Sequence, residues 1–182
     1  MWVSNPIGAR ALQDLVFVAL AGAFLLLAGW AWRRTQAYTL PRPYPGWFRI
    51  WFVSVQLMGG LLPLLAWAWS AWQGLAGAAT FWSSYLAVLG LQILCESLTL
   101  RQFRSVVWVM VPYLFVPYRL WQLYDGWALL PEASLAMRVL LGLNLAVWLG
   151  NYLLDLAQLP RLFQWPLQAE AEDPASRQTA SS

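Results

Sequence analysis

The stretch LVFVALAGAFLLLAGWAW, residues 15–32, decides the fold of this chain. It holds 18 residues and no charged or strongly polar side chain. A helix needs about this length of apolar sequence to cross the hydrocarbon core of a bilayer. Four further apolar stretches follow, each bounded by Arg, Pro or Trp. The sequence therefore predicts an all-α, multi-pass transmembrane helical bundle.

The overall composition agrees with lipid as the solvent for these stretches. The 182 residues are 60% hydrophobic and only 10% charged, whereas ordinary soluble domains carry about 25% charged residues. A soluble domain of this size cannot bury so much apolar surface, so the excess is expected to face lipid. We expect one bundle over residues 1–168 and no soluble catalytic domain. Residues 169–182 combine acidic residues with Ser and Thr, which is typical of a disordered tail.

The predicted spans number five, with four as the alternative, and they lie at about residues 13–32, 50–72, 81–100, 105–121 and 133–154. The fourth is uncertain because its apolar run is short and is interrupted by Pro112 and Pro117. If this helix reaches Trp121 with Arg119 extending to the interface, arginines near helix ends divide seven inside to three outside. If it does not cross, the division is eight to two. Charge favours four spans, whereas the hydrophobicity of residues 106–116 favours five, which we expect.

The charges around the first span predict its orientation. Asp14 precedes the span and several arginines follow it, so we expect the N-terminus outside and the first loop in the cytoplasm. This loop is expected to contact anionic lipid headgroups. We expect a bacterial plasma membrane, with a thylakoid membrane as the alternative. The predicted headgroup contacts are Arg33, Arg34, Arg42 and Arg49.

The absence of certain residue types excludes several kinds of chemistry. The chain has no His and no Lys, so it lacks the usual haem and zinc ligand, the commonest general base and a Schiff-base amine. Its single cysteine, Cys95, cannot form an intramolecular disulfide or a thiolate cluster. We therefore predict a non-enzymatic protein without metal, cofactor or nucleic-acid partner. Ligation of a pigment by Glu96, Gln92 or an Asn is the alternative.

Polar residues at helical spacing mark one face of the third span and one face of the fifth. A carboxylate inside a membrane helix is costly unless it is paired, protonated or exposed to water, which makes Glu96 the sharpest local signal. We expect the two polar faces to meet, either as structural interhelical contacts or as a proton or ion relay through Glu96 and Asp155. The candidate network is Tyr85, Gln92, Glu96, Thr99, Asn144, Asn151 and Asp155.

Three further patterns concern packing. Gly59-Gly60 followed by Pro63 predicts a loosened or kinked second span. A face of small residues, Gly142, Ala146 and Gly150, predicts close approach of another helix, in this chain or in a second copy. Arg119 and Asp125 are expected to compensate one another in an external, interfacial segment.

These observations leave three function classes open. The leading expectation is an accessory or assembly component that packs with other membrane subunits or with itself, because small and aromatic contact faces are abundant. The alternative is a small transporter or proton-coupled carrier that uses Glu96 and the break at Gly59. An enzyme acting on lipid is the weakest hypothesis, since no catalytic residue set is recognisable.

Overall fold

The computed structural model describes residues 6–33, 46–102, 107–130 and 134–160, and the regular structure within them is entirely helical. The predicted all-α fold is confirmed. The elements are α1 (Pro6–Ala31), α2 (Gly46–Gln56), the π-helical turn η1 (Leu57–Leu61), α3 (Leu62–Trp72), α4 (Ala76–Gln102), α5 (Val107–Leu129) and α6 (Leu135–Ala157).

Four helical segments are long and apolar enough to cross a membrane. They are α1, the continuous segment from α2 through η1 to α3, α4 and α6. Many of their large apolar side chains are exposed, which is unfavourable in water. In α1, for example, Leu15 and Leu20 are both 67% exposed and Leu27 is 69% exposed. This surface fits a membrane protein.

The fourth predicted span is a continuous helix, α5, that is longer than expected. It begins at Val107 and passes through Pro112 and Pro117 to Leu129, whereas the sequence predicted an end near Trp121. The last turns contain polar residues, which is why the apolar pattern stopped short. They remain helical because other helices supply partners for those polar side chains, as described below. α5 is not among the four segments that qualify by hydropathy.

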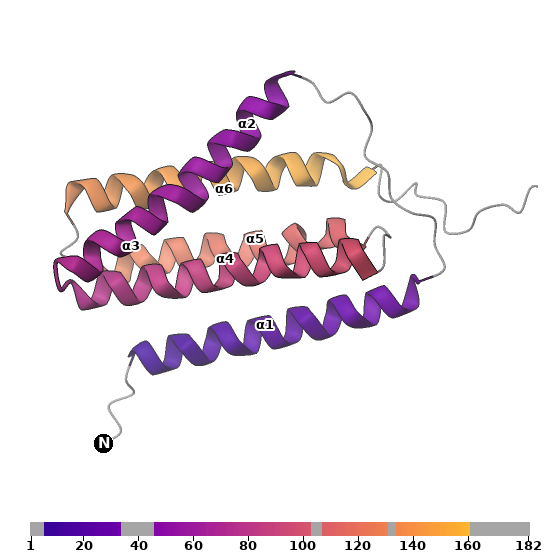
Figure 1. Ribbon diagram of the computed structural model, residues 1–182, viewed down its shortest axis with the longest axis horizontal. Coiled ribbons are helices and arrows are strands. Elements are labelled where there is room, and N and C mark those ends of the chain that lie inside the picture. The colour runs from indigo at the N-terminus through magenta and orange to yellow at the C-terminus, as the bar shows by residue number, and fades with distance from the viewer. Residues whose placement is uncertain (1–5, 34–45, 103–106, 131–133, 161–182) are drawn as a thin grey trace, which may run out of the picture.

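The helices form a ring of four with one helix outside it. α4 and α5 pack together, α3 packs on α4, α6 packs on α5, and η1 contacts α6 to close the ring. α1 lies along the outer side of α4 and α5, opposite α6 (Figure 1). The α2–η1–α3 segment crosses the others obliquely (Figure 1). Gly74, with φ of 69°, makes the tight turn between α3 and α4.

The predicted break in the second span is confirmed as the π-helical turn η1. Pro63 has no backbone N–H and cannot donate to the carbonyl of Gly59, four residues earlier. That carbonyl instead accepts a hydrogen bond of 2.7 Å from the hydroxyl of Tyr85 on α4. The carbonyl freed within the helix is therefore used for a contact with α4. π-Helical turns inside α-helices are frequently found at functional sites.

Glycines let tryptophan rings lie directly on the backbone. A Cβ atom on Gly59 would come within 2.7 Å of the Trp148 ring, and one on Gly150 within 2.8 Å of the Trp51 ring. At Gly142 an added Cβ would make only ordinary contact with Trp127, at 3.5 Å, and Ala146 stays exposed. The small-residue face of α6 therefore serves packing within the chain. Whether a second copy also uses it stays a prediction.

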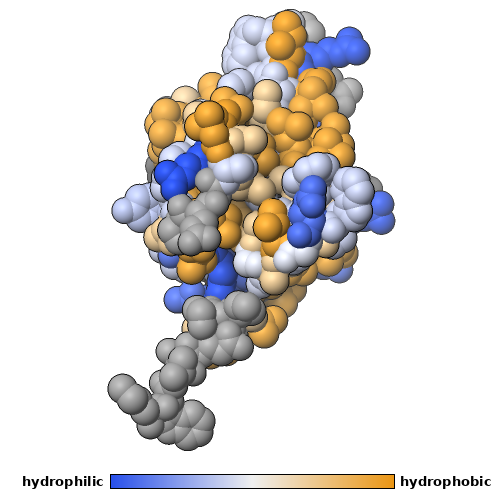
Figure 2. Space-filling model, turned by 90° about the vertical axis from the view of Figure 1, so that its left-hand side faces the viewer, coloured by the Kyte–Doolittle hydropathy of each residue, from blue (hydrophilic) through white to orange (hydrophobic). Residues whose placement is uncertain are grey.

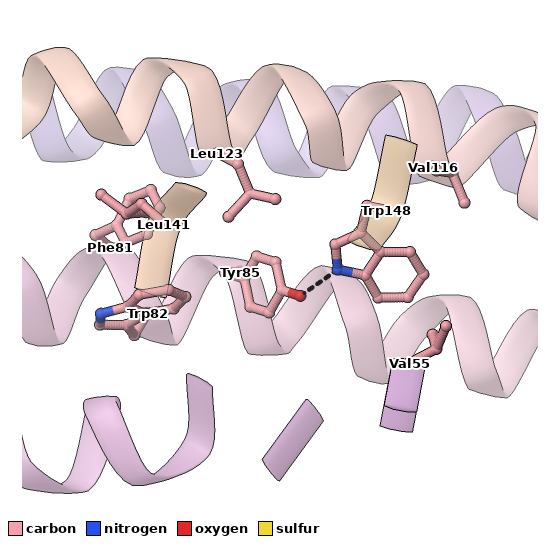
Figure 3. Close-up of a cluster of buried hydrophobic side chains, with 8 residues drawn as sticks. All are labelled: Val55, Phe81, Trp82, Tyr85, Val116, Leu123, Leu141 and Trp148. Carbon is pink, nitrogen blue, oxygen red and sulfur yellow. Dashed lines mark hydrogen bonds between the residues drawn. The ribbon is translucent and has the colours of Figure 1, made fainter. Parts of the chain in front are cut away.

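Two apolar clusters fill the interior. One lies inside the ring of four and is shown in Figure 3; its buried members are Val55, Phe81, Trp82, Tyr85, Val116, Leu123, Leu141 and Trp148. The other joins α1 to α4 and α5 through Ala21, Leu25, Val88, Val107, Val111 and Phe115. The first cluster surrounds the polar groups that form the candidate site.

The neighbouring glycines of η1 provide a matched test of this packing. Gly59→Ala should destabilise the protein by about 1–3 kcal/mol because the new methyl group collides with Trp148. Gly60→Ala should be neutral or stabilising by up to about 1 kcal/mol, since nothing lies within 4 Å of its added Cβ. Thermal unfolding in detergent, followed by circular dichroism, measures both. Equal midpoints for the two variants would contradict the described contact.

Candidate functional site

A fully buried arginine lies at the middle of α5. Arg119 is 0% exposed, and its guanidinium carbon lies 4.1 Å from the ring centroid of Trp148 and 5.5 Å from that of Tyr85. Its Nη2 donates a hydrogen bond of 2.7 Å to Oε1 of Gln92 on α4. Its Nε and Nη1 have no hydrogen-bond partner among the described residues. The aromatic faces stabilise the cation, but its hydrogen-bonding capacity is only partly used.

Gln92 links this arginine to a carboxylate. The amide of Gln92 accepts from Arg119 and donates from Nε2 to Oε1 of Glu96, at 2.8 Å. Glu96 is half-buried and lies one turn further along α4. Arg119 and Glu96 do not pair directly; the ion pair found in the described part of the chain is Arg10–Asp125. The neutral amide of Gln92 therefore lies between the positive charge of Arg119 and the carboxyl group of Glu96.

Tyr85 joins three helical segments at the side of Arg119. Its hydroxyl accepts a 2.7 Å hydrogen bond from Nε1 of Trp148 on α6 (Figure 3) and donates to the carbonyl of Gly59 in η1. Oδ1 of Asn144 lies 3.2 Å from the same hydroxyl as a second acceptor, and its Nδ2 donates to the carbonyl of Leu140. The two polar faces predicted for the third and fifth spans thus meet at Tyr85 and Asn144.

The remaining members of the candidate network lie nearer the end of the bundle shown at the right of Figure 1. Nδ2 of Asn151 donates to Oδ2 of Asp155 at 3.2 Å, and the Tyr113 hydroxyl donates to the Asp155 backbone carbonyl. Among the described residues the carboxyl group of Glu96 bonds to Gln92 and that of Asp155 to Asn151, and no hydrogen bond joins the two carboxyl groups. Thr99 bonds only to carbonyls of its own helix, at Cys95 and Glu96.

Three arginines, Arg101, Arg104 and Arg161, lie close in sequence to the cytoplasmic ends predicted for α4 and α6, and the sequence made a charge-balanced network with them possible. Arg101 is exposed on α4, whereas Arg104 and Arg161 lie outside the described residues. Of the predicted headgroup contacts, Arg33 is exposed, with its guanidinium over the ring of Trp30 at 5.0 Å, and Arg49 is also exposed. Arg34 and Arg42 lie outside the described residues. Lipid contact by these four stays a prediction.

Two expectations about α5 were wrong. Arg119 was expected to reach the interface and to be compensated by Asp125. It is instead buried at mid-helix, while Asp125 pairs with Arg10 of α1 at 2.5 Å. The physical reason is that Gln92, Tyr85 and Trp148 together provide an acceptor and two aromatic faces inside the ring. These partners come from three other positions along the chain, so no local pattern around Arg119 revealed them.

A second polar cluster fastens α1 to the bundle and was missed in the sequence. The carboxylate of Asp14 accepts hydrogen bonds from the Tyr118 hydroxyl at 2.6 Å, from Nε2 of Gln122 at 2.9 Å and from the Ser84 hydroxyl. Arg10 and Asp14 stand at i, i+4 spacing, but each bonds to other helices and not to the other, so this spacing does not reveal the cluster. Figure 2 looks onto this end of the bundle, where hydrophilic side chains interrupt the hydrophobic surface.

The geometry provides a buried cation linked to an ionisable carboxylate and surrounded by aromatic rings. Within the described ranges no group of three or more His, Cys, Asp or Glu side chains is placed to hold a metal ion. No protein-family description, curated protein or solved structure matches this chain. The function therefore has to be argued from the site itself.

Removing the Tyr85 hydroxyl tests the contact between the helical segments. Tyr85→Phe leaves the indole N–H of Trp148 without its acceptor, so we expect a loss of about 1–3 kcal/mol of stability. Tyr124→Phe is the matched control because Tyr124 is 72% exposed on α5. Chemical or thermal unfolding in detergent measures both variants. A Tyr85→Phe protein as stable as the control would show that the hydroxyl contributes nothing.

Proposed function

We propose that this protein is a small proton-coupled membrane carrier in which Glu96 takes up and releases the proton. The observation that carries the proposal is Arg119, entirely buried at the middle of its helix and linked to Glu96 through Gln92. A charged side chain in the middle of a membrane helix costs at least about 2.5–3.5 kcal/mol on insertion scales. Such residues typically mark solute or proton pathways.

The incomplete hydrogen bonding of Arg119 favours a functional role over a purely structural one. A buried polar group that serves only to join helices is normally satisfied by its neighbours. Nε and Nη1 of Arg119 have no such partners among the described residues. Arg10, at the end of the bundle, also has a buried Nε without a partner, but its Nη1 pairs with Asp125 and its Nη2 donates to the Gln122 carbonyl, so its charge is directly neutralised.

Glu96 is suited to exchange a proton with the aqueous side. It is half-buried, near the end of α4 and next to the buried Gln92 and the fully buried Arg119. A proton on Glu96 removes the negative charge that balances Arg119, so protonation changes the electrostatic field at the centre of the bundle. The charged and ionisable groups around Glu96 are Arg119 on α5, Asp155 on α6, and Cys95 on α4 itself.

The π-helical turn gives the bundle a place at which to bend. Transporters commonly place an interrupted helix beside the solute site. η1 is such an interruption, and its Gly59 carbonyl is bonded to Tyr85, which lies against Arg119. A change in charge at Arg119 and Glu96 would therefore occur next to η1, the irregular turn of the second spanning segment.

The assembly role expected from the composition lacks an equally specific observation. It was expected because catalytic residue sets are absent and small and aromatic contact faces are abundant; on the small-residue face of α6, Gly142 and Gly150 are in contact with Trp127 and Trp51 of the same chain. Association with other membrane subunits remains compatible with a carrier.

For the topology, we propose five crossings in a bacterial plasma membrane, with the N-terminus outside. α5 is counted because it is as long as α6 and lies antiparallel between α4 and α6 (Figure 1). The start of α1, the turn between α3 and α4, and the facing ends of α5 and α6 lie at one end of the bundle (Figure 1). The opposite end, where α1 and α4 finish (Figure 1), carries the exposed Arg33 and Arg101, which supports a cytoplasmic location.

Reporter fusions test this topology. A periplasmic alkaline phosphatase inserted at Gly74 should be active, and one fused after Ser182 should be inactive, because five crossings place the C-terminus inside. A cytoplasmic fluorescent reporter after Ser182 should give the reverse signal. Phosphatase activity at both positions would indicate four crossings and would contradict the count.

The carrier function predicts solute-driven proton movement in proteoliposomes. Vesicles loaded with a pH-sensitive dye are exposed to gradients of small carboxylates, amino acids, sugars or amines, with protein-free vesicles subtracted. We expect at least one class to move protons. Glu96→Gln should abolish the coupled signal because the amide cannot exchange a proton, whereas Ser97→Ala, an exposed neighbour on α4, should retain it.

Two results would refute the proposal. One is the absence of proton movement with every class of solute, when the protein is folded and inserted. The other is a coupled signal that Glu96→Gln leaves unchanged. Solute movement without any proton movement would remove the coupling and with it the role of Glu96.

A further inference from the structure

We infer that Arg119 is the binding site for a small monocarboxylate anion, taken up together with the proton on Glu96. The inference rests on the proposed carrier function and deepens it by naming the class of solute. It is carried by the unused donors of a fully buried guanidinium and by the charge balance around them.

The donor pattern of Arg119 suits a carboxylate. Gln92 occupies only Nη2, so N–H groups on Nε and Nη1 remain available. A guanidinium presents its donors in a planar array that matches the two oxygens of a carboxylate. The guanidinium carbon lies over the rings of Trp148 and Tyr85, which stabilise its charge without occupying the N–H groups of Nε and Nη1.

The surroundings restrict the size of the anion. The Trp148 ring lies 4.1 Å from the guanidinium and is itself held against Gly59, where even a Cβ atom would collide. Asn144, whose Oδ1 lies 3.2 Å from the Tyr85 hydroxyl, is also fully buried. A compact anion with one charge fits such a site better than a large or multiply charged one.

Charge balance argues for uptake of a proton with the anion. Arg119 and Glu96 compensate one another through Gln92. An anion bound to Arg119 would leave Glu96 without its counter-charge in a low-dielectric interior, near a second carboxyl group, that of Asp155. Protonation of Glu96 restores neutrality, which gives one proton for each anion. Tyr85 and Cys95 are the other ionisable groups near this site.

The chain provides its own comparison in Arg10. This second buried arginine is 7% exposed, and its guanidinium pairs with Asp125 at 2.5 Å, so its charge is already neutralised. It also donates to the carbonyl of Gln122. Of the two arginines buried in the described part of the chain, only Arg119 lacks a direct carboxylate partner.

Calorimetric titration of the full-length protein in detergent tests the inference independently of transport. Sodium formate and sodium acetate are the probes, acetamide is the neutral analogue, and sodium chloride tests a simple halide. We expect formate or acetate to bind and acetamide not to bind. Titrations in two buffers of different ionisation enthalpy should report about one proton taken up per anion, and Glu96→Gln should remove that uptake.

Variants locate the binding. Arg119→Gln should weaken binding by more than about tenfold, and Arg119→Lys should weaken it less, since a lysine keeps the charge but loses the planar donor array. Arg101→Gln, at an exposed arginine of α4, should bind like the wild type. If Arg119→Gln does not fold, the wild-type titration of formate against acetamide still decides.

Each outcome separates the two proposals. Failure of both carboxylates to bind, binding of chloride alone, or equal affinity in a folded Arg119→Gln protein would overturn the anion site. Carboxylate binding without solute-driven proton flux would retain the site and refute the carrier. Proton-coupled movement of a neutral solute, unchanged in Arg119→Gln, would retain the carrier and refute the site.

Discussion

The rest of the structure is arranged around one guanidinium that has to be accommodated in an apolar interior. Arg119 cannot lose its charge, so its neighbours must supply polar contacts and aromatic faces where lipid or leucine would otherwise pack. Tyr85, Gln92 and Trp148 meet this need from two other helices. Tyr85 also donates a hydrogen bond to the Gly59 carbonyl. The position of the π-helical turn η1, which completes the ring, is therefore linked to the burial of Arg119.

Much of the fold is predictable from the sequence because membrane helices are specified locally. Lipid cannot satisfy backbone hydrogen bonds, so a long apolar run has little choice but to be a helix. The break near Gly59 was also predictable, since Pro63 necessarily lacks the donor for that carbonyl. The polar faces of the third and fifth spans were visible at helical spacing, and Tyr85 and Asn144 do meet.

The site itself was only partly predictable, because its members come from separate helices. Glu96 and Gln92 stood out inside an apolar helix, whereas Arg119 lay in a polar stretch that resembled an interfacial end. Its burial depends on Gln92 and Trp148, which the sequence could not place beside it. Asp14 was interpreted only as a charge outside the first span, although it accepts bonds from α4 and α5. Tertiary contacts, not local preference, determine both positions.

The π-helical turn also determines which neighbours the second segment can contact. An α-helix advances by about 100° per residue, so the wider turn of η1 rotates α3 about its axis relative to a regular continuation of α2. The two halves consequently present different faces: α2 touches α6, whereas α3 lies mainly on α4. A single uninterrupted helix would direct one stripe of side chains along its whole length. Because η1 changes the direction in which side chains point, the α2–η1–α3 segment can contact both α4 and α6, which have few contacts with one another.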